Sequence, residues 1–350
     1  MDTWKLLKQP DIKKFINKFD SPNLVVFKNT KQIQRECEQQ NWNLLNPAAE
    51  IINKVEQKIS QVEWLEEKQK LLPEFEIKTC KEVSCDSAPF ILQFNRAHTG
   101  NGTFLIEDKE DLDPLQQKFP DRPVKISKYI EGDMFTLNCI VSRDQILTSS
   151  ISYQITGIEP FTTNTFATVG NDWGLADTQL NIKDQQKIKQ IGEQVGQKLR
   201  IDNFFGLFGI DVIKSSSGEI YLIEINARQP ASTTFESHLQ IKAEKRNDDK
   251  TTTFYAHLLS LLKQNINFNI PEINSGAQII YRNKQQQQLD VSQARRQLEQ
   301  AGFQVITYNN NKPNSELMRI MSNKTIFTRP NHFNSRGQKI TSILSEAKIS

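Results

Sequence analysis

The chain has 350 residues, a length that suggests two domains or a little more. Its 44 basic and 41 acidic residues leave a net charge of only +3, and there is no long basic run, so we expect no nucleic-acid partner. Because no run approaches the ~18 apolar residues of a membrane span, we expect no membrane partner either.

The N-terminus and the cysteines indicate the compartment. The first residues lack the apolar core and the small-residue cleavage site of a signal peptide. The four cysteines form no CxxC pair and have no matching His/Cys cluster, so we predict reduced thiols and no zinc site. We therefore expect a cytoplasmic protein, and the sequence leaves a homodimer open.

The first third of the chain predicts a β-α segment, a helix and a strand–loop–strand unit. Residues 21–27 (SPNLVVF) are a short apolar run, and residues 30–40 follow with helical spacing. Residues 50–72 are charged and helical and end at Pro73, which favours a helix stop. Residues 89–106 place an apolar strand, a small-residue loop and a second strand in succession.

The middle of the chain predicts two strands, a loop and a helix. Residues 124–130 (VKISKYI) alternate as in a strand, and residues 136–141 (TLNCIV) predict its neighbour across the turn. Residues 154–177 are rich in Gly, Thr, Asn and aromatics, which favours a long loop, either a surface loop or one that closes over substrate. Residues 184–199 have the apolar spacing of a helix.

A hairpin around the turn sequence KSSSG carries an unusual polar face. In its second strand Glu224, Asn226 and Arg228 occupy alternate positions and point to one face. A tightly closed hairpin would pair Asp211 with Leu222 and make Glu224 its diagonal neighbour, ~7–8 Å away. Two carboxylates and an amide suit a hard divalent cation such as magnesium. The alternative is that both acids are edge-strand charges paired with lysines.

The C-terminal part predicts a small α/β domain. A boundary is expected at residues 265–271, before a strand at 277–282. The glutamine run at 285–288 predicts a solvated loop. A helix at 292–302 and a strand at 303–308 complete this domain.

The segment AHTGNGT (97–103) lies between two apolar runs. Its glycines would let backbone N–H groups approach a phosphate chain, and Thr103 can donate a hydroxyl. A plain hairpin turn is about equally consistent with Gly-Asn-Gly. There is no G-x-x-x-x-G-K-[ST] motif and no G-x-S-x-G motif, so neither a P-loop nor an α/β-hydrolase is expected.

The order of these motifs resembles the ATP-grasp superfamily, with carboxylate–amine ligases as the most similar group. The pieces, spanning about residues 55–240, are Lys58, FILQFNRAHTGNGTFLI, VKISKYIEG, GLFGIDVI and YLIEINARQPAST. The resemblance implies an α+β ATP-grasp fold in which two α+β subdomains clasp ATP. It implies a short β-α segment at 1–54, the ATP-grasp domain at 55–265 and a small C-terminal α/β domain at 266–350.

The resemblance also implies roles for individual residues. Asp211, Glu224 and Asn226 would hold magnesium, two ions in similar enzymes, with manganese as a substitute. Lys58 and Arg228 would be catalytic, Lys58 at the α- and β-phosphates and Arg228 at the substrate carboxylate or its acyl phosphate. Nucleotide contacts are expected from Lys58, Gln93, His98, Gly100, Gly102, Thr103, Lys128, Tyr129, Ile130 and Glu131.

The implied reaction is an ATP-dependent ligation. ATP would phosphorylate a small carboxylate, an amine or another nucleophile would attack the acyl phosphate, and ADP and phosphate would leave.

Three residues depart from the family pattern. Gln93 stands where a lysine is usual, Ser127 where an acid receives the adenine amino group, and Met134 where an acid binds the ribose. Lys125, Arg96 or His98 could restore the missing charge. Two alternatives therefore stay open: a nucleotide-binding pseudoenzyme that recruits a partner, and a carboxylase-like or thiol-ligase enzyme.

Overall fold

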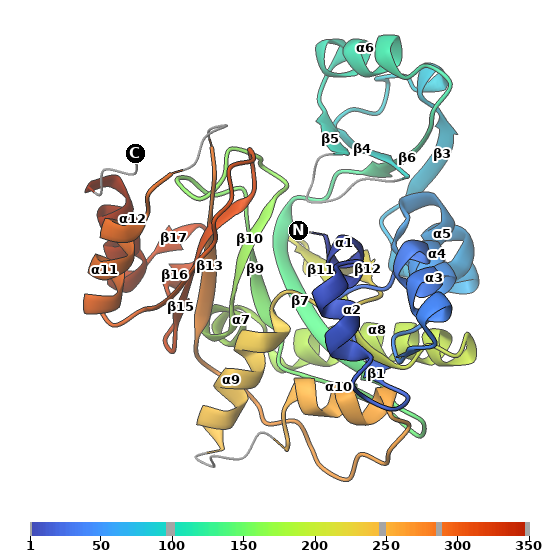
Figure 1. Ribbon diagram of the computed structural model, residues 1–350. Coiled ribbons are helices and arrows are strands. Elements are labelled where there is room, and N and C mark those ends of the chain that lie inside the picture. Colours follow the sequence, from blue (N-terminus) through green and yellow to red (C-terminus); the bar gives the residue numbers. More distant parts are fainter. Residues whose placement is uncertain (1, 96–101, 245–249, 285–288, 347–350) are drawn as a thin grey trace.

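The computed structural model describes residues 2–95, 102–244, 250–284 and 289–346. The chain forms an N-terminal unit, a small four-stranded sheet and a large nine-stranded sheet. Figure 1 shows the small sheet and its helix α6 projecting above the rest of the molecule. None of the helices in these described ranges is long and apolar enough to cross a membrane.

The N-terminal unit packs short helices on a two-stranded parallel sheet. Its elements are α1 (Thr3–Leu7), α2 (Pro10–Ile16), β1 (Asn23–Leu24), α3 (Lys31–Gln40) and β2 (Asn43–Leu44). Leu7, Ile33, Cys37 and Trp42 form part of its small core. The predicted β-α segment is therefore present. Helices α4 (Ala49–Glu56) and α5 (Lys58–Leu65) and the 3-10 helix η1 (Glu66–Leu71) lead from it into the small sheet.

The small sheet has the strand order β3-β6-β4-β5, and neighbouring strands are antiparallel. Its elements are β3 (Phe75–Thr79), η2 (Cys80–Glu82), β4 (Phe90–Phe94), β5 (Thr103–Ile106), α6 (Lys109–Lys118) and β6 (Pro123–Lys128). One face packs against α6 through a separate apolar cluster that includes Leu92, Ile106 and Leu112. The opposite face of the small sheet, which carries Gln93 and Lys125, does not contribute to this cluster.

The large sheet has the order β12-β11-β7-β9-β10-β13-β15-β14, with β8 paired to β7. Its strands are β7 (Gly132–Val141), β8 (Ile146–Thr148), β9 (Ser152–Thr156), β10 (Thr168–Asp172), β11 (Gly206–Ser215), β12 (Ile220–Asn226), β13 (Ala277–Arg282), β14 (Gln304–Thr307) and β15 (Glu316–Ser322). The neighbouring elements are α7 (Trp173–Gln179), α8 (Ile182–Ile201), α9 (Thr233–Ala243), α10 (Thr253–Leu261), α11 (Ser292–Gln300), β16 (Phe327–Arg329), β17 (His332–Phe333) and α12 (Ser335–Glu346).

Helix α8 covers one end of the large sheet. Ile188, Ile191, Val195 and Leu199 are fully buried, as the helical spacing predicts. Glycines let this helix approach the sheet closely, since a Cβ at Gly192 would lie 2.8 Å from the sulfur of Cys139. Such packing fixes the strands that carry the polar site on their other face.

Residues 154–177 are not the predicted loop. They contain most of β9, all of β10 and the start of α7, joined by a shorter connection. Trp173 is fully buried. Asn171, one of the polar residues that suggested a loop, belongs instead to a hydrogen-bonded row on one sheet face, where it donates to Ser152 at 3.0 Å and accepts from Gln278 at 3.2 Å.

Two further features concern how the parts join. The predicted pairing of 124–130 with 136–141 is wrong, because β6 belongs to the small sheet and β7 to the large one, so the chain crosses between sheets at residues 129–131.

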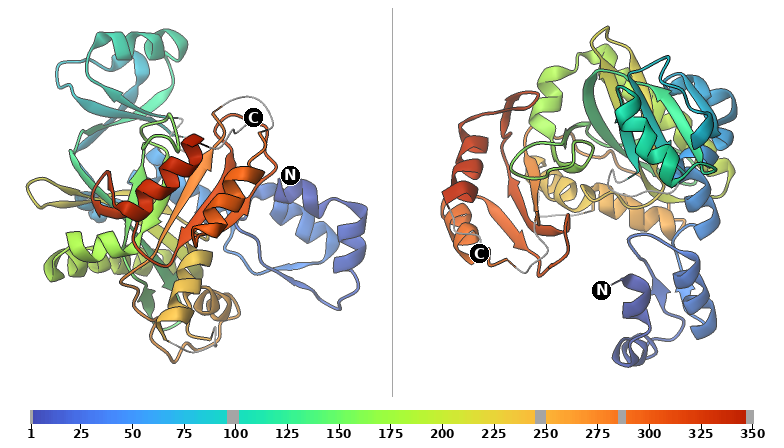
Figure 2. Two further views of the ribbon diagram at one scale, coloured as in Figure 1. Left: turned by 90° about the vertical axis from the view of Figure 1, so that its left-hand side faces the viewer. Right: turned by 90° about the horizontal axis from the view of Figure 1, so that it is seen from above.

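Strand β13 pairs with β10, so the C-terminal strands extend the large sheet. The domain boundaries at 54/55 and 265/266 stay predictions. In the right-hand view of Figure 2 the C-terminal helices and the blue N-terminal unit lie at separate edges of the molecule.

Candidate functional site

Strands β11 and β12 form the hairpin that carries the expected metal ligands. Asp211 lies directly opposite Glu224, and a β-bulge follows between Asp211 and Val212. The predicted pairing of Asp211 with Leu222 is therefore wrong by two residues, because Lys214 lies opposite Ile220 rather than Glu219 and the bulge inserts one residue more. Both carboxylates still share one face, and they are closer than predicted, since directly opposed Cβ atoms lie ~5 Å apart.

Asp211 is a buried carboxylate whose hydrogen-bond partners include Thr136, Gln154 and Asn226. The Thr136 hydroxyl donates to Oδ1 at 2.7 Å, and the Asn226 amide donates to Oδ2 at 3.1 Å. Burial and the negative charge of Glu224 raise the pKa of Asp211 to about 6, although the Thr136 hydrogen bond opposes the shift. A buried carboxylate whose pKa is raised by a second carboxylate beside it favours a cation between the two.

The donor set fits a hard cation that shares its ligands with another molecule. Within the described ranges no group of three or more His, Cys, Asp or Glu side chains gathers as a metal cluster. Asn226 uses its carbonyl Oδ1 to accept from Arg228 Nη2 at 2.9 Å, so only one of its lone pairs remains for an ion. Asp211, Glu224 and Asn226 could therefore hold magnesium only with phosphate oxygens or waters completing the shell.

Lys58 links helix α5 to this hairpin. It is the first residue of α5 and is 7% exposed. Its Nζ lies 2.9 Å from Oε1 of Glu224 on β12. The predicted phosphate-binding lysine and a predicted metal ligand thus meet, although they are far apart in the sequence.

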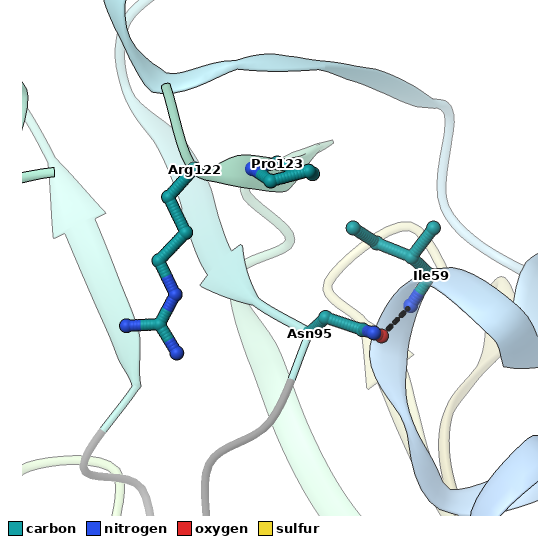
Figure 3. A pocket seen from close by; sticks show the side chains of 4 residues that line it. All are labelled: Ile59, Asn95, Arg122 and Pro123. Atoms are coloured by element: carbon teal, nitrogen blue, oxygen red, sulfur yellow. Dashed lines mark hydrogen bonds between the residues drawn. The ribbon is translucent and has the colours of Figure 1, made fainter. Parts of the chain in front are cut away.

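Asn95 ties the start of α5 to the end of β4. Its backbone carbonyl accepts from Lys58 N at 3.2 Å, and its side-chain oxygen accepts from Ile59 N at 2.9 Å. A cavity of about 300 Å³ opens beside this junction, lined by Ile59, Asn95, Arg122 and Pro123. Figure 3 shows Asn95 pointing to Ile59 and the Arg122 guanidinium extending away from that bond. The two hydrogen bonds to Asn95 fix the first turn of α5 and with it the position of Lys58.

The predicted phosphate flap follows β4. Gln93 is buried, and its amide donates to the hydroxyl of Thr103 at 3.2 Å. The carbonyl of Gly102 accepts from Phe94 N at 3.0 Å. His98 and Gly100, also predicted for this flap, lie outside the described residues. Gln93 and Thr103 therefore hold the base of the flap together.

The segment after β6 is the predicted adenine-binding hinge. Lys128 N donates to Glu74 O at 2.9 Å, and the carbonyl of Glu131 accepts from Ser216 N at 3.3 Å. These bonds anchor both ends of the hinge, with Tyr129 and Ile130 between them. Tyr129 is 37% exposed, so its side chain lies at the surface.

The two departures near the hinge lie on different sheets. Ser127 is buried in β6 opposite Ile91, and Met134 lies in β7 opposite Ile213.

Arg228 is oriented by three contacts. Its Nε lies 3.3 Å from Oε1 of Glu56, its Nη2 donates to Asn226, and its guanidinium lies 5.5 Å from the ring centroid of Phe27. Glu56 is the last residue of α4 and also pairs with Lys28. The predicted carboxylate-binding arginine thus already faces a carboxylate of the chain.

The sequence alone did not single out Thr136 or Glu56. Thr136 becomes visible only once β7 is known to pair with β11, since it lies directly opposite Asp211. Glu56 lies two positions before Lys58, but no motif marks it. The described structure brings together Lys58, Asp211, Glu224, Asn226 and Arg228, while the roles assigned to them stay predictions.

Comparison with known proteins places this arrangement in a family. The sequence profile described as the ATP-grasp domain matches residues 55–232. A carboxyaminoimidazole ribonucleotide synthase from Aspergillus clavatus, solved with ATP, is similar with a TM-score of 0.65 at 15% identity, over 97% of this chain and 85% of that one.

Two further solved structures are similar. An N5-carboxyaminoimidazole synthetase from Staphylococcus aureus with ADP has a TM-score of 0.64 at 16% identity, over 90% of this chain and 77% of that one. An L-amino acid ligase from Bacillus licheniformis has a TM-score of 0.64 at 14% identity, over 90% of this chain and 76% of that one. A search of curated proteins gives no match. The profile match covers just over half of the 350 residues, and it confirms the predicted family and fold: the chain belongs to the ATP-grasp family.

Proposed function

We propose that this protein is an ATP-dependent ligase that joins a small carboxylate to an amine or another nucleophile. ATP phosphorylates the carboxylate, the nucleophile attacks the acyl phosphate, and ADP and phosphate leave. The observation that carries this proposal is the approach of Lys58 to Glu224 at 2.9 Å beside buried Asp211 in a chain of the ATP-grasp family. Cations and carboxylates at one place suit a nucleotide phosphate with its metal.

The residues divide the work of phosphoryl transfer. Asp211, Glu224 and Asn226 would hold magnesium, which when bound neutralises charge on the phosphates. Lys58, which pairs with Glu224 at 2.9 Å, would donate to phosphate oxygens. Tyr129 and Ile130 supply backbone contacts to the base, and Gln93 and Thr103 fix the start of the flap over the phosphates.

Arg228 binds the oxygens of the acid or its acyl phosphate. Glu56 and Asn226 engage Nε and Nη2, and no hydrogen bond within the described residues occupies Nη1, which would bind substrate oxygens. The polar row of Ser152, Asn171 and Gln278 extends from Asp211 and Thr136 across the same sheet face, because these residues are paired through adjacent strands. A polar, uncharged row of this kind suits the body of a hydrophilic acid or amine.

The test is a screen for ADP release with magnesium, ATP and pairs of carboxylic acids and amines, followed by mass spectrometry of the products. We expect ADP and phosphate in step with a condensed product. AMP and pyrophosphate as products would overturn the proposal.

The four cysteines, all free thiols, agree with the expected cytoplasmic location, and a homodimer stays open.

A second candidate is a carboxylase-like reaction in which bicarbonate is the activated acid. It is favoured by the similar fold of the carboxyaminoimidazole ribonucleotide synthases. Adding bicarbonate to the same screen separates the two, because ADP release that depends on bicarbonate and an amine, with no organic acid, identifies the carboxylase.

A further inference from the structure

A second buried lysine lies close to the site. Lys125 on β6 is 2% exposed, and its ammonium makes neither a hydrogen bond nor an ion pair with the described part of the chain. The centroid of the Phe75 ring lies 5.8 Å from its Nζ. A buried ammonium is strongly unfavourable unless an anion or hydrogen-bond acceptors surround it.

The electrostatic surroundings show which groups Lys125 faces. Burial and the positive charge of Lys58 lower the pKa of Lys125 to about 8, and the negative charge of Glu224 partly opposes this shift. Lys125 therefore lies near the ion pair of Lys58 and Glu224, even though it comes from the other sheet. Lys125 thus adds a second positive charge beside the ion pair of Lys58 and Glu224.

Lys125 also lies directly opposite Gln93. The two are paired residues of the antiparallel strands β6 and β4, so their side chains leave the same face of the small sheet, with Cβ atoms ~5 Å apart. The amide of Gln93 is engaged by Thr103 at 3.2 Å. Gln93 thus orders the base of the flap. The positive charge at this pair of opposed residues comes from Lys125.

We propose that Lys125 binds phosphate oxygens of the nucleotide and supplies, from the neighbouring strand, the positive charge that Gln93 lacks. The ammonium is a compact charge that suits a phosphate oxygen, and a bound nucleotide would give it an acceptor. Gln93 is a positioning residue that holds Thr103. This inference rests on the proposed nucleotide-binding function.

The test compares nucleotides that share a base but differ in phosphates. Calorimetry with the full chain at fixed magnesium measures binding of ADP and of adenosine. Lys125→Met keeps the aliphatic stem against Phe75 and removes the charge, and we expect ADP binding to weaken about 10- to 100-fold. Adenosine binding should stay within about twofold of the wild type. Without ligand, the variant should unfold at a higher temperature than the wild type, because an unpaired buried charge is gone.

An exchange variant and a control complete the design. Gln93→Lys combined with Lys125→Gln moves the charge back one strand, and we expect it to recover most of the lost ADP affinity. Lys78→Gln on the adjacent β3, a lysine paired with Glu76, should change neither ligand's affinity. Unchanged ADP binding in Lys125→Met, or an equal loss for ADP and adenosine, would overturn the proposal.

The outcome is separable from that of the ligase proposal. ADP binding that depends on Lys125 in a protein that turns over no acid–amine pair would support this inference while the ligase assignment fails. A wild-type chain that does not bind ADP would overturn both.

Discussion

Replacing Glu224 by glutamine separates the metal site from the fold. The glutamine keeps the shape of the side chain in β12 but removes one of two directly opposed carboxylates. The Glu224 side chain is 38% exposed and that of its partner Lys58 is 9% exposed, so the ion pair is open to solvent on one side. Such a pair contributes up to ~1 kcal/mol.

The loss of stability should be small. Removing the negative charge of Glu224 also relieves Asp211, whose raised pKa is partly due to that charge. We expect the free energy of unfolding to change by at most ~1 kcal/mol, which is roughly 1–2 °C in the melting temperature of a chain this long. Turnover should fall far more, since a catalytic metal stabilises the transition state by several kcal/mol and ~1.4 kcal/mol is tenfold in rate.

The assay follows ADP release and thermal unfolding on the same samples at millimolar magnesium. We expect Glu224→Gln to lose at least about 100-fold in turnover with nearly unchanged melting. Glu219→Gln is the matched control, because Glu219 lies in the same hairpin turn, where it accepts from the Tyr221 hydroxyl, and should leave turnover intact. Turnover of Glu224→Gln within about threefold of the wild type would refute the metal-site reasoning.

Further predictions concern substrate, metal and pH. Arg228→Lys keeps the charge but loses the planar fork, so calorimetry should show unchanged ATP binding while ADP-release kinetics show a raised KM for the acid. Equal loss of both would contradict this. Thr136→Val removes the donor to Asp211 and should raise the magnesium concentration for half-maximal turnover about 10-fold, with no such shift if the hydrogen bond is unimportant. Burial lowers the pKa of His257 to about 4, where its Nδ1 accepts from Leu207 N at 3.0 Å. This folded-state pKa lies below the unfolded value of 6.5. The neutral His257 side chain therefore contributes about 3 kcal/mol to the free energy of unfolding above pH 6.5, and this contribution is lost as the pH falls toward 4. Measured by denaturant unfolding, the stability of His257→Asn should fall less between pH 6.5 and 4 than that of the wild type. An equal fall in both proteins would contradict the lowered pKa of His257.

The order of the motifs predicted the family and the fold because each motif has a local physical signature. Alternating polar and apolar residues placed Glu224, Asn226 and Arg228 on one strand face. What the sequence could not supply was pairing across the sheets. The bulge after Asp211 depends on how two strands meet, so the predicted register missed it.

The same reason explains why residues 154–177 were misassigned as a loop and why Lys125 was only one of three candidates for the missing charge. Asn171 lies on a strand whose polar face is stabilised by the neighbouring strands, and in the sequence alone such a residue is typical of a loop. Lys125 gains its meaning from Gln93 on the opposite strand and from Lys58 on another element. None of these contacts has a sequence signal before the strands are paired.

The central claim is that ATP activates a carboxylate as an acyl phosphate, and isotope transfer tests it most directly. The acid identified by the ADP-release screen is labelled with oxygen-18 in its carboxylate and incubated with the protein, ATP, magnesium and the amine. The proposed mechanism predicts one labelled oxygen in the released inorganic phosphate and none in ADP. Label in AMP, or unlabelled phosphate alongside a labelled amide and water, would contradict it.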